Sequence, residues 1–387
     1  MISVVGFKFL ASIGFGRPKV PEAHDKYVVY KFPCYTEGVA LLQKTIDTLV
    51  QLKAVEFRLI WKKEQSSTTW GSSIRDSTNV VPYLVNVKVR KPNERSRLGK
   101  RGKHDSQMVV IHFLNKVYFN VPMNPPELEV YHQIKNVIAL SPTFYEYHFT
   151  VDADTTVNKF SVNRLISAIH DKKLGACGET EAANAKQSTI IMMQVYEYLI
   201  SHDMAKAFDF PFGFVTCPSG CFMTHRLRTP DTHKPLLSSN QVNQEYSENR
   251  VDTLHMKSPL HLREDRYLTT LLLKHFPLHK TQFAQDAHAY TIAPDDWKVL
   301  LSQRRCWINS ALHNLGELTF LDQLCVFCCF FTRFVVMIDL ISTLIQPVTL
   351  TYLIINVVRG DQAVPLQSLM ILAVYGPQAL VILLRRK

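Results

Sequence analysis

Two acidic residues follow an apolar segment in the middle of the chain. Residues 144–151 (FYEYHFTV) read as a strand, and Asp152-Ala153-Asp154 comes directly after it. Residues two apart in an extended strand face the same side, so Asp152 and Asp154 can share one divalent cation. Mg²⁺ or Mn²⁺ prefers such oxygen ligands and leaves room for the phosphate oxygens of a diphosphate leaving group. A surface turn is the alternative interpretation of the same pattern.

A second acidic motif, Glu264-Asp265-Arg266, stands at the head of an apolar helical segment that extends to Phe276. An inverting glycosyl transfer needs one carboxylate to take the proton from the attacking hydroxyl. A helix N-terminus that points into a cleft could hold such a group, although the motif alone favours the other interpretation. The alternative is a carboxylate that only stabilises the N-terminus of a helix through the helix dipole.

A third motif, Gln303-Arg304-Arg305-Cys306-Trp307, combines cations with an indole. Two adjacent arginines can bind diphosphate oxygens, and a tryptophan face can stack on a pyranose ring. The alternative is a basic and aromatic anchor beside a membrane segment. The formal net charge of +11 agrees with an anionic partner, but charge alone does not choose among nucleic acid, a phosphate-bearing substrate and a membrane surface.

The elements that position these motifs alternate between strands and helices. This alternation predicts an α/β domain from about residue 25 to residue 300. The expected elements are a strand at 27–32, a helix at about 41–52, a polar loop at 61–79, a strand at 80–89, a basic loop at 90–104, and mostly helical structure over 158–210 with a strand near 174–178. The glycines of the basic loop would let it approach a phosphate, or the loop is simply solvated.

The C-terminal part has a different composition. Residues 340–358 and 362–384 contain no charged residue, and each run is about as long as the core of a bilayer requires. Residues 324–339 are also apolar but contain Arg333 and Asp339, so they extend a span or form an interfacial helix. The eight cysteines show no framework of disulfides, which indicates reduced thiols, and Cys325 and Cys328 are interpreted as packing residues instead of a zinc site.

The order of these motifs, followed by the apolar region, resembles the fungal-type chitin synthases, closest to class IV. The similarity extends from about residue 27 to the end of the chain. The segments that carry it are FPCYTEG (32–38), GKHDSQM (102–108), ELEVYHQIKNV (127–137), VDADT (151–155), GACGET (175–180), QVYEYLISH (194–202), RVDTLHMK (250–257), EDRYLTTLLLK (264–274), WINSALHNL (307–315) and FVVMIDLISTLIQPV (334–348).

The resemblance implies a role for each matching residue. Asp154, helped by Asp152, would ligate Mg²⁺ or Mn²⁺. Asp265 of the Glu264-Asp265-Arg266 motif would be the general base acting on the 4-hydroxyl of a growing polymer. The residues implied in binding are Glu37 and Lys103 for the nucleotide, Gln303, Arg304 and Arg305 for the diphosphate, and Trp307 for the acceptor sugar.

The resemblance also implies an architecture, partners and a location. The fold would be a GT-A type α/β glycosyltransferase core with a mixed sheet, followed by interfacial and transmembrane helices. The donor would be UDP-N-acetylglucosamine and the acceptor a chitin oligosaccharide, with membrane lipids as further partners, no nucleic acid, and a homo-oligomer as the assembly. The location would be the plasma membrane, multi-pass with a cytoplasmic catalytic domain, and intracellular vesicles. The expected divisions are 1–26 as an N-terminal remnant, 27–300 as the glycosyltransferase domain, 301–323 as interfacial helices, and 324–387 as transmembrane helices of an incomplete channel.

Several positions depart from the family pattern. The Cys-Asp-Gly that the family carries after its second strand is absent, and the region between Leu59 and Asn79 is several tens of residues shorter than expected. Cys306 replaces an arginine, Ser219 replaces the proline of a Leu-Pro-Gly turn, and Arg263 replaces a glycine. We therefore expect reduced or absent turnover and keep two alternatives, a non-catalytic relative and another processive synthase that makes cellulose or hyaluronan.

Overall fold

The chain divides into two compact units, which are described separately. The sheet unit consists of residues 18–183 and 218–293, and the helical unit of residues 1–17, 184–217 and 294–387. The computed structural model describes residues 26–33, 39–50, 57–60, 70–76, 79–85, 103–137, 139–169, 172–206, 215, 218, 220–248 and 264–321, together with single positions and short groups between 333 and 355.

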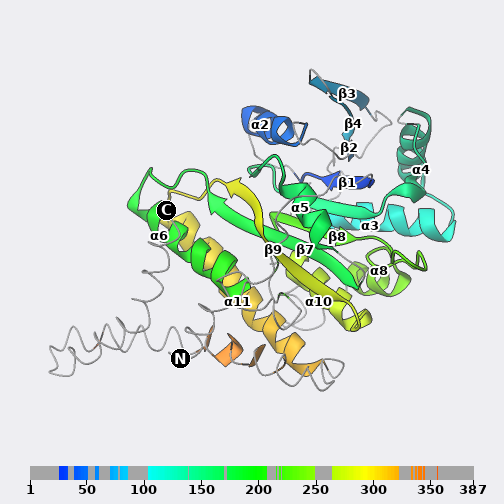
Figure 1. Cartoon of the computed structure of the whole chain (residues 1–387). Coiled ribbons are helices and arrows are strands. Elements are labelled where there is room, and N and C mark those ends of the chain that lie inside the picture. Colours follow the sequence, from blue (N-terminus) through cyan, green and yellow to red (C-terminus); the bar gives the residue numbers. More distant parts are fainter. Residues whose placement is uncertain are drawn as a thin grey trace, which may run out of the picture. The chain divides into compact units, whose positions relative to one another are not determined.

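A mixed sheet is the centre of the sheet unit (Figure 1). Among the residues described it has nine strands in the order β3-β4-β2-β1-β5-β8-β7-β9-β6. The strands are β1 (Val28–Lys31), β2 (Phe57–Ile60), β3 (Trp70–Asp76), β4 (Asn79–Val85), β5 (Tyr147–Val151), β6 (Thr156–Val157), β7 (Lys173–Ala182), β8 (Phe222–Arg226) and β9 (Lys280–Thr291).

The middle of the sheet contains both parallel and antiparallel strand pairs. Strand β1 pairs in parallel with β2 and β5, whereas β5 and β7 both pair antiparallel with β8. Strands β7 and β9 are parallel, with an irregular register between Gly178 and Glu179. The expected α/β class with a mixed sheet is therefore confirmed.

One face of the sheet packs on helix α5 (Ser161–Ala168). All residues of β1 and β5 are buried, as expected for central strands rich in β-branched and aromatic residues. Phe149 of β5 meets Phe222 of β8 edge to face, with ring centroids 5.7 Å apart, and both rings belong to the same core cluster as Leu165 of α5. Burying each of these side chains contributes about 1.5–3 kcal/mol, which stabilises the pairing of β8 with β5, the strand that ends just before Asp152.

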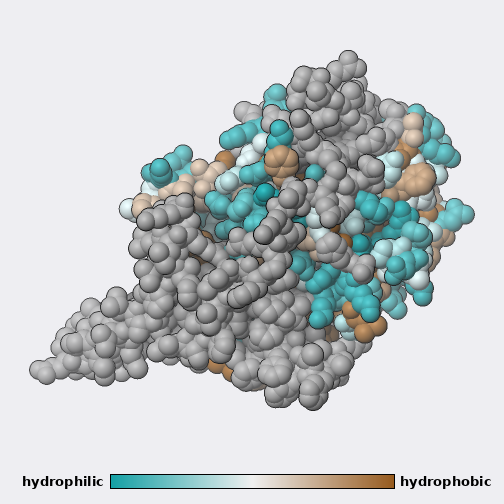
Figure 2. All heavy atoms as spheres, in the orientation of Figure 1, coloured by the Kyte–Doolittle hydropathy of each residue, from teal (hydrophilic) through white to brown (hydrophobic). Residues whose placement is uncertain are grey.

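The other helices of the sheet unit include those that bring Lys103 and Asp265 to the sheet. They are α2 (Val39–Val50), α3 (Lys103–Phe119), α4 (Pro125–His132), η1 (Gln133–Val137), η2 (Pro142–Phe144), α8 (Asn240–Ser247) and α10 (Glu264–His275). Ser239 caps the N-terminus of helix α8, because its side chain accepts a hydrogen bond from the backbone N–H of Val242. On the face seen in Figure 2, the coloured surface on the side of α3, α4 and α8 is mainly hydrophilic with a few apolar patches, and Tyr118, Phe119 and Leu128 are exposed apolar residues of α3 and α4.

Two long helices, α6 (Thr189–Tyr198) and α11 (Trp297–Phe320), form the described part of the helical unit, with η3 (Leu199–Met204) continuing α6. Asp296 caps the start of α11 by accepting a hydrogen bond from the backbone of Lys298. Within the part of the chain that the structure describes, no helix combines the length and the apolar character that a bilayer crossing requires. Almost all of the segment 324–387, expected to be transmembrane, lies outside the described residues.

One local expectation is wrong. The Ser- and Thr-rich region 61–79 was expected to be a loop, but residues Trp70–Asp76 form strand β3, which pairs antiparallel with β4 from Trp70 opposite Val85 to Asp76 opposite Asn79. Strand β4 supplies the hydrogen bonds that make this segment a strand. The local composition does not predict this pairing, because strand propensity depends strongly on context.

Candidate active site

Strand β5 delivers Asp152 to the edge of the sheet unit's core. The strand ends at Val151, and the backbone N–H of Asp152 donates to the carbonyl of Cys221, 3.4 Å away, at the start of β8. A turn follows, because the N–H of Thr155 donates to the carbonyl of Asp152 at 3.1 Å. The Asp152 side chain is thus held at the strand end but remains 35% exposed.

Helix α10 delivers Asp265 in its first turn. Leu268, Leu271 and Leu272 are buried and fix the helix against the rest of the unit. Thr269 donates its hydroxyl to the Asp265 carbonyl at 3.0 Å. The Asp265 residue is only 9% exposed, so its carboxylate must find partners inside the protein.

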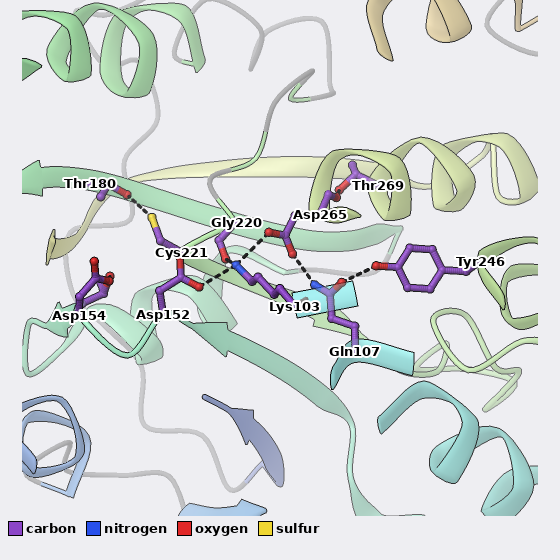
Figure 3. A network of polar contacts seen from close by, with 11 residues as sticks. Lys103, Gln107, Asp152, Asp154, Thr180, Gly220, Cys221, Tyr246, Asp265 and Thr269 are labelled. Atoms are coloured by element: carbon purple, nitrogen blue, oxygen red, sulfur yellow. Dashed lines mark hydrogen bonds and ion pairs between the residues drawn. The ribbon is translucent and has the colours of Figure 1, made fainter. Parts of the chain in front are cut away.

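Lys103, the first residue of α3, joins the two acids (Figure 3). Its Nζ lies 2.7 Å from Oδ1 of Asp152 and 2.9 Å from Oδ2 of Asp265. The same ammonium also donates to the carbonyl oxygen of Gly220. These contacts define what we call the lysine–aspartate cluster (Lys103, Asp152 and Asp265), in which one cation serves two carboxylates.

A string of hydrogen bonds holds the other oxygen of Asp265. The amide Nε2 of Gln107, one turn after Lys103 on α3, donates to Oδ1 of Asp265. The hydroxyl of Tyr246 on α8 donates in turn to Oε1 of Gln107. Figure 3 shows the three side chains in a line from α8 to α10. Both oxygens of the buried carboxylate are therefore hydrogen-bonded from fixed elements.

The environment keeps Asp265 ionised. Burial would raise the pKa of its carboxyl, but the charges of Lys103 and Lys31 and the hydrogen bonds from Lys103 and Gln107 outweigh burial and hold the pKa below its usual value. A carboxylate that is deprotonated and held in one orientation is in the form that can accept a proton, which a general base requires.

Two buried histidines lie on β5 and β8, and one of them, His225, is close enough to Asp265 for the charge of that carboxylate to affect its pKa. His148 of β5 stands opposite His225 of β8, and their rings stack with centroids 6.5 Å apart. Burial lowers the pKa of His225 to about 4, against an opposing effect of Asp265 and with a further lowering by Lys31. Burial, Lys31 and His225 lower the pKa of His148 as well. Both imidazoles are therefore neutral near pH 7.

Asp154 lies beyond Asp152 on the side away from Lys103 (Figure 3). Its Oδ1 accepts a hydrogen bond from the hydroxyl of Thr155 at 3.2 Å. Carboxylate oxygens at a strand end fit Mg²⁺ or Mn²⁺, which keep several coordination positions for water and phosphate. Because Asp152 already contacts Lys103, a cation bound there would share this carboxylate with an ammonium group.

A separate group of ligand-type side chains lies on β7 and β9. Among the residues described, Glu179, Glu181 and His288 form the one group of three such side chains close enough to hold a metal ion, with donor atoms within 4.8 Å of one another. His288 Nδ1 lies 3.2 Å from Glu181 and 3.5 Å from Glu179. The interaction with Glu181 raises the pKa of His288 against the effect of burial, and the charges of both glutamates add to this rise. A protonated His288 thus already balances part of their charge.

The predicted diphosphate and acceptor residues lie on α11 in the helical unit. Arg304 forms an ion pair with Glu197 of α6, with Nη2 2.6 Å and Nε 2.7 Å from the same carboxylate oxygen, and its Nη1 donates to Gln303. The Arg304 guanidinium also lies over the Trp307 indole, 4.1 Å from the ring centroid. Tyr198 stacks near the same indole at 6.3 Å. Arg305 is exposed.

The structure thus assembles part of the predicted site. It brings Lys103, Asp152 and Asp265 together, whereas Glu37 lies outside the described residues. Glu264 begins helix α10, and the half-buried Arg266 has an Nε without a hydrogen-bond partner among the described residues. The residues that sequence reasoning missed are Gln107, Gly220 and Tyr246. Gln107 belongs to the GKHDSQM segment, which the family resemblance singled out, but the resemblance did not indicate its contact with Asp265.

Comparison with known proteins identifies related sequences. Residues 64–387 match a family model described as chitin synthase. The whole chain aligns at 51% identity with chitin synthase 5 of Cryptococcus neoformans var. grubii and with chitin synthase 8 of Mycosarcoma maydis, covering 23% and 22% of these proteins. It aligns at 46% identity with chitin synthase E of Aspergillus fumigatus, covering 24% of that protein.

The chain therefore spans less than a quarter of the length of the curated relatives it matches. Each alignment is also longer than the chain itself, with 438 or 436 positions against 387 residues. The relatives thus contain residues within the matched region that this chain lacks.

Proposed function

The chain belongs to the chitin synthase family, and from this premise we propose that it transfers N-acetylglucosamine from UDP-N-acetylglucosamine to the 4-hydroxyl of a growing chitin chain, with inversion at the anomeric carbon. The single observation that carries the proposal is the lysine–aspartate cluster, where Lys103 Nζ lies 2.9 Å from Asp265 and 2.7 Å from Asp152. It combines an ionised, ordered base with a cation suited to a diphosphate.

Asp265 acts as the general base in this proposal. Its carboxylate takes the proton of the acceptor 4-hydroxyl as the oxygen attacks the anomeric carbon, and the bond from that carbon to the diphosphate breaks to release UDP. The hydrogen bonds from Lys103 and Gln107 support this role because they hold both carboxylate oxygens in one orientation. Glu264 and Arg266 flank the base on α10 and complete the proposed catalytic motif.

Lys103, Asp152 and Asp154 are proposed to handle the negative charge of the donor. Asp154 and Asp152 would hold Mg²⁺ or Mn²⁺, which supplies charge neutralisation to the leaving UDP when it is bound. Lys103 would exchange its contact with Asp152 for a phosphate oxygen, because its three N–H donors already meet Asp152, Asp265 and the carbonyl of Gly220. Glu37 is proposed to contact the nucleotide, as the family resemblance implies.

The α11 residues are proposed to serve the diphosphate and the acceptor. Arg304 is already paired with Glu197 and lies on the indole of Trp307, which supports a role in holding the indole. The exposed Arg305, together with Gln303, is the better candidate for phosphate contact. Trp307 would contact the acceptor sugar with the part of its indole that Arg304 and Tyr198 leave uncovered.

Exposed apolar residues on α11 support the proposed membrane association. Trp297, Leu301 and Ile308 are 48%, 53% and 47% exposed, and their spacing places them along one side of the helix. An amphipathic helix of this kind can lie in the headgroup region of a bilayer. We therefore propose the plasma membrane, with intracellular vesicles as a second location, transmembrane helices after residue 324, and a cytoplasmic catalytic domain that works as a homo-oligomer.

A non-catalytic role in a larger assembly is the second candidate. Two observations favour it: Cys306 stands where the family pattern has an arginine, and the relatives contain residues that this chain lacks. The test is polymer formation by membranes that contain the full chain, supplied with radiolabelled UDP-N-acetylglucosamine and Mg²⁺.

We expect slow incorporation that Asp265→Asn abolishes. Asp231→Asn changes an exposed aspartate of the same unit and should leave incorporation unchanged. No incorporation by the unchanged chain would favour the non-catalytic role, and equal incorporation by Asp265→Asn would remove Asp265 from the mechanism.

A further inference from the structure

We infer that Tyr246 is a positioning residue for Asp265. The Tyr246 hydroxyl fixes the orientation of the Gln107 carboxamide, and this carboxamide in turn holds the Asp265 carboxylate. The inference rests on the proposed function in that Asp265 is taken as the base. It assigns a task in the reaction to a residue of α8 whose hydroxyl donates to Gln107.

The three groups form one directed string. Tyr246 donates its O–H to Oε1 of Gln107, and Gln107 donates its N–H to Oδ1 of Asp265 (Figure 3). Tyr246 is 0% exposed and Gln107 is 1% exposed, so water does not compete for these hydrogen bonds. Helices α8, α3 and α10, distant in sequence, each contribute one member.

The direction of the string follows from which groups can donate. An ionised carboxylate only accepts hydrogen bonds, whereas a carboxamide has one accepting end and one donating end. The carboxamide of Gln107 therefore assists Asp265 in one orientation and repels it when rotated by half a turn. The Tyr246 hydroxyl is the donor that meets the accepting end and so selects the helpful orientation.

The position of the Tyr246 ring does not depend on its hydroxyl. The ring lies 4.4 Å from the His104 ring and 6.1 Å from the Tyr267 ring, centroid to centroid. The His104 imidazole also lies 3.0 Å from the Tyr246 carbonyl oxygen. Tyr246→Phe keeps these ring contacts and removes only the oxygen, so it deletes the orienting donor without opening a large cavity.

The two oxygens of Asp265 are held by different kinds of donor. Lys103 holds Oδ2 by charge, while Gln107 holds Oδ1 through the directed string. Loss of the string would leave Lys103 in place, so Asp265 would stay close to the cation but lose its fixed rotation. This predicts a defect in turnover without a defect in donor binding.

The experiment is a double-mutant cycle on the full chain with Tyr246→Phe, Gln107→Met and the double variant. Gln107→Met retains length and apolar volume but neither donates nor accepts a strong hydrogen bond. Tyr147→Phe is the matched control, because Tyr147 is also a buried tyrosine of this unit and its hydroxyl accepts from Arg226 instead. The readouts are kcat and KM for UDP-N-acetylglucosamine, and the pH titration of the Asp265 carboxyl followed by infrared difference spectra against Asp265→Asn.

We expect Tyr246→Phe to lower kcat roughly five- to tenfold, as the loss of one buried hydrogen bond would. The KM should stay the same and the pKa of Asp265 should rise, because a hydrogen bond to its charged form is weakened. In the Gln107→Met background, Tyr246→Phe should change neither kcat nor the pKa of Asp265 further. Tyr147→Phe should alter thermal stability only.

Two results would overturn the inference: an unchanged Asp265 titration in Tyr246→Phe, or equal effects of Tyr246→Phe with and without Gln107. A raised Asp265 pKa with unchanged kcat would instead support the positioning of the carboxylate and refute Asp265 as the base. The titration does not depend on activity, so failure of the proposed function and failure of this inference are distinguishable.

Discussion

The Nζ of Lys103 lies 2.9 Å from Oδ2 of Asp265, so the proposed base is paired with a lysine that also contacts Asp152. This pairing resolves a conflict, because a carboxylate that is only 9% exposed would otherwise take up a proton. It also ties the proposed base to the proposed metal-binding acid through one side chain.

Lys103→Met should cost the full chain about 3–5 kcal/mol of stability at neutral pH, since it leaves a buried carboxylate without its cation. The lowered pKa of Asp265 stabilises the folded state above the pKa of the unfolded chain, and this stability is lost as the pH falls through the folded pKa. Removing Lys103 raises that pKa, so the acid limb of the activity profile should move to higher pH. Denaturant unfolding and pH–rate profiles measure the two effects.

Lys26→Met is the control, because the Lys26–Glu146 ion pair has a similar length, 3.0 Å, but lies at the surface. Its loss should cost less than about 1 kcal/mol. Equal costs for the two variants would contradict a special role of Lys103.

Gly220→Ala should lower kcat by about a hundredfold, because small displacements of a reacting group are that costly. A Cβ built at Gly220 would overlap the carboxylate of Asp265 and displace it. Gly316→Ala on α11 meets no atom within 4 Å, so it should leave activity unchanged and stabilise the helix slightly. A fully active Gly220→Ala would show that the carboxylate tolerates movement.

Cys306→Arg should raise turnover tens-fold, because a second guanidinium would add a charge-assisted contact to the diphosphate. Cys306 lies half-buried on α11 beside the exposed Arg305. Cys306→Lys restores charge without the planar fork and should recover less. If neither variant gains activity, the residues present in the relatives but absent here limit turnover instead.

Chelation of divalent cations should stop incorporation, and Asp154→Asn should raise the Mg²⁺ concentration needed for half-maximal rate at least about tenfold. Glu179→Gln tests the other candidate set, whose donor atoms lie within 4.8 Å of one another. We expect no change in the Mg²⁺ requirement from it. The opposite pattern, with Glu179→Gln sensitive and Asp154→Asn insensitive, would move the metal to the strands β7 and β9.

His225 should make the fold acid-sensitive. Its pKa is about 4 in the folded chain and 6.5 as an ordinary histidine, so the unfolded chain binds the extra proton between these values. Stability therefore falls by about 3 kcal/mol as the pH decreases from 6.5 to 4. His225→Asn should flatten this part of the stability profile, measured by unfolding at several pH values, whereas His132→Asn at an exposed site should leave the profile unchanged.

The sequence was sufficient to predict the elements that hold the acids. The apolar run before Asp152 predicted a strand, which the structure places at Tyr147–Val151, and the apolar repeat after Asp265 predicted a helix, so both carboxylates were expected at element ends. Their meeting at Lys103 could be expected only from the family resemblance, because nothing in the spacing of residues 103, 152 and 265 sets their distance.

The roles of the residues that the sequence did not indicate were missed for a related reason. Tyr246 stands in the short polar helix α8, where its pattern indicates a packed aromatic and nothing more. Its task depends on a partner 139 positions earlier in the chain. Strand β3 was missed because its seven residues include serines and a glycine, a composition typical of a loop. They form a strand because β4 pairs with them along their whole length.

The strand order has a consequence for synthesis on the ribosome. Strand β8 lies between β5 and β7, although the chain makes β7 first and then adds residues 184–217 to the other unit. Until residues 222–226 emerge, β5 and β7 each present an open hydrogen-bonding edge, the kind of surface that recruits chaperones or promotes aggregation. Asp265 is translated later still, after the strand that closes this gap, so both edges can be paired before the proposed proton acceptor reaches its place.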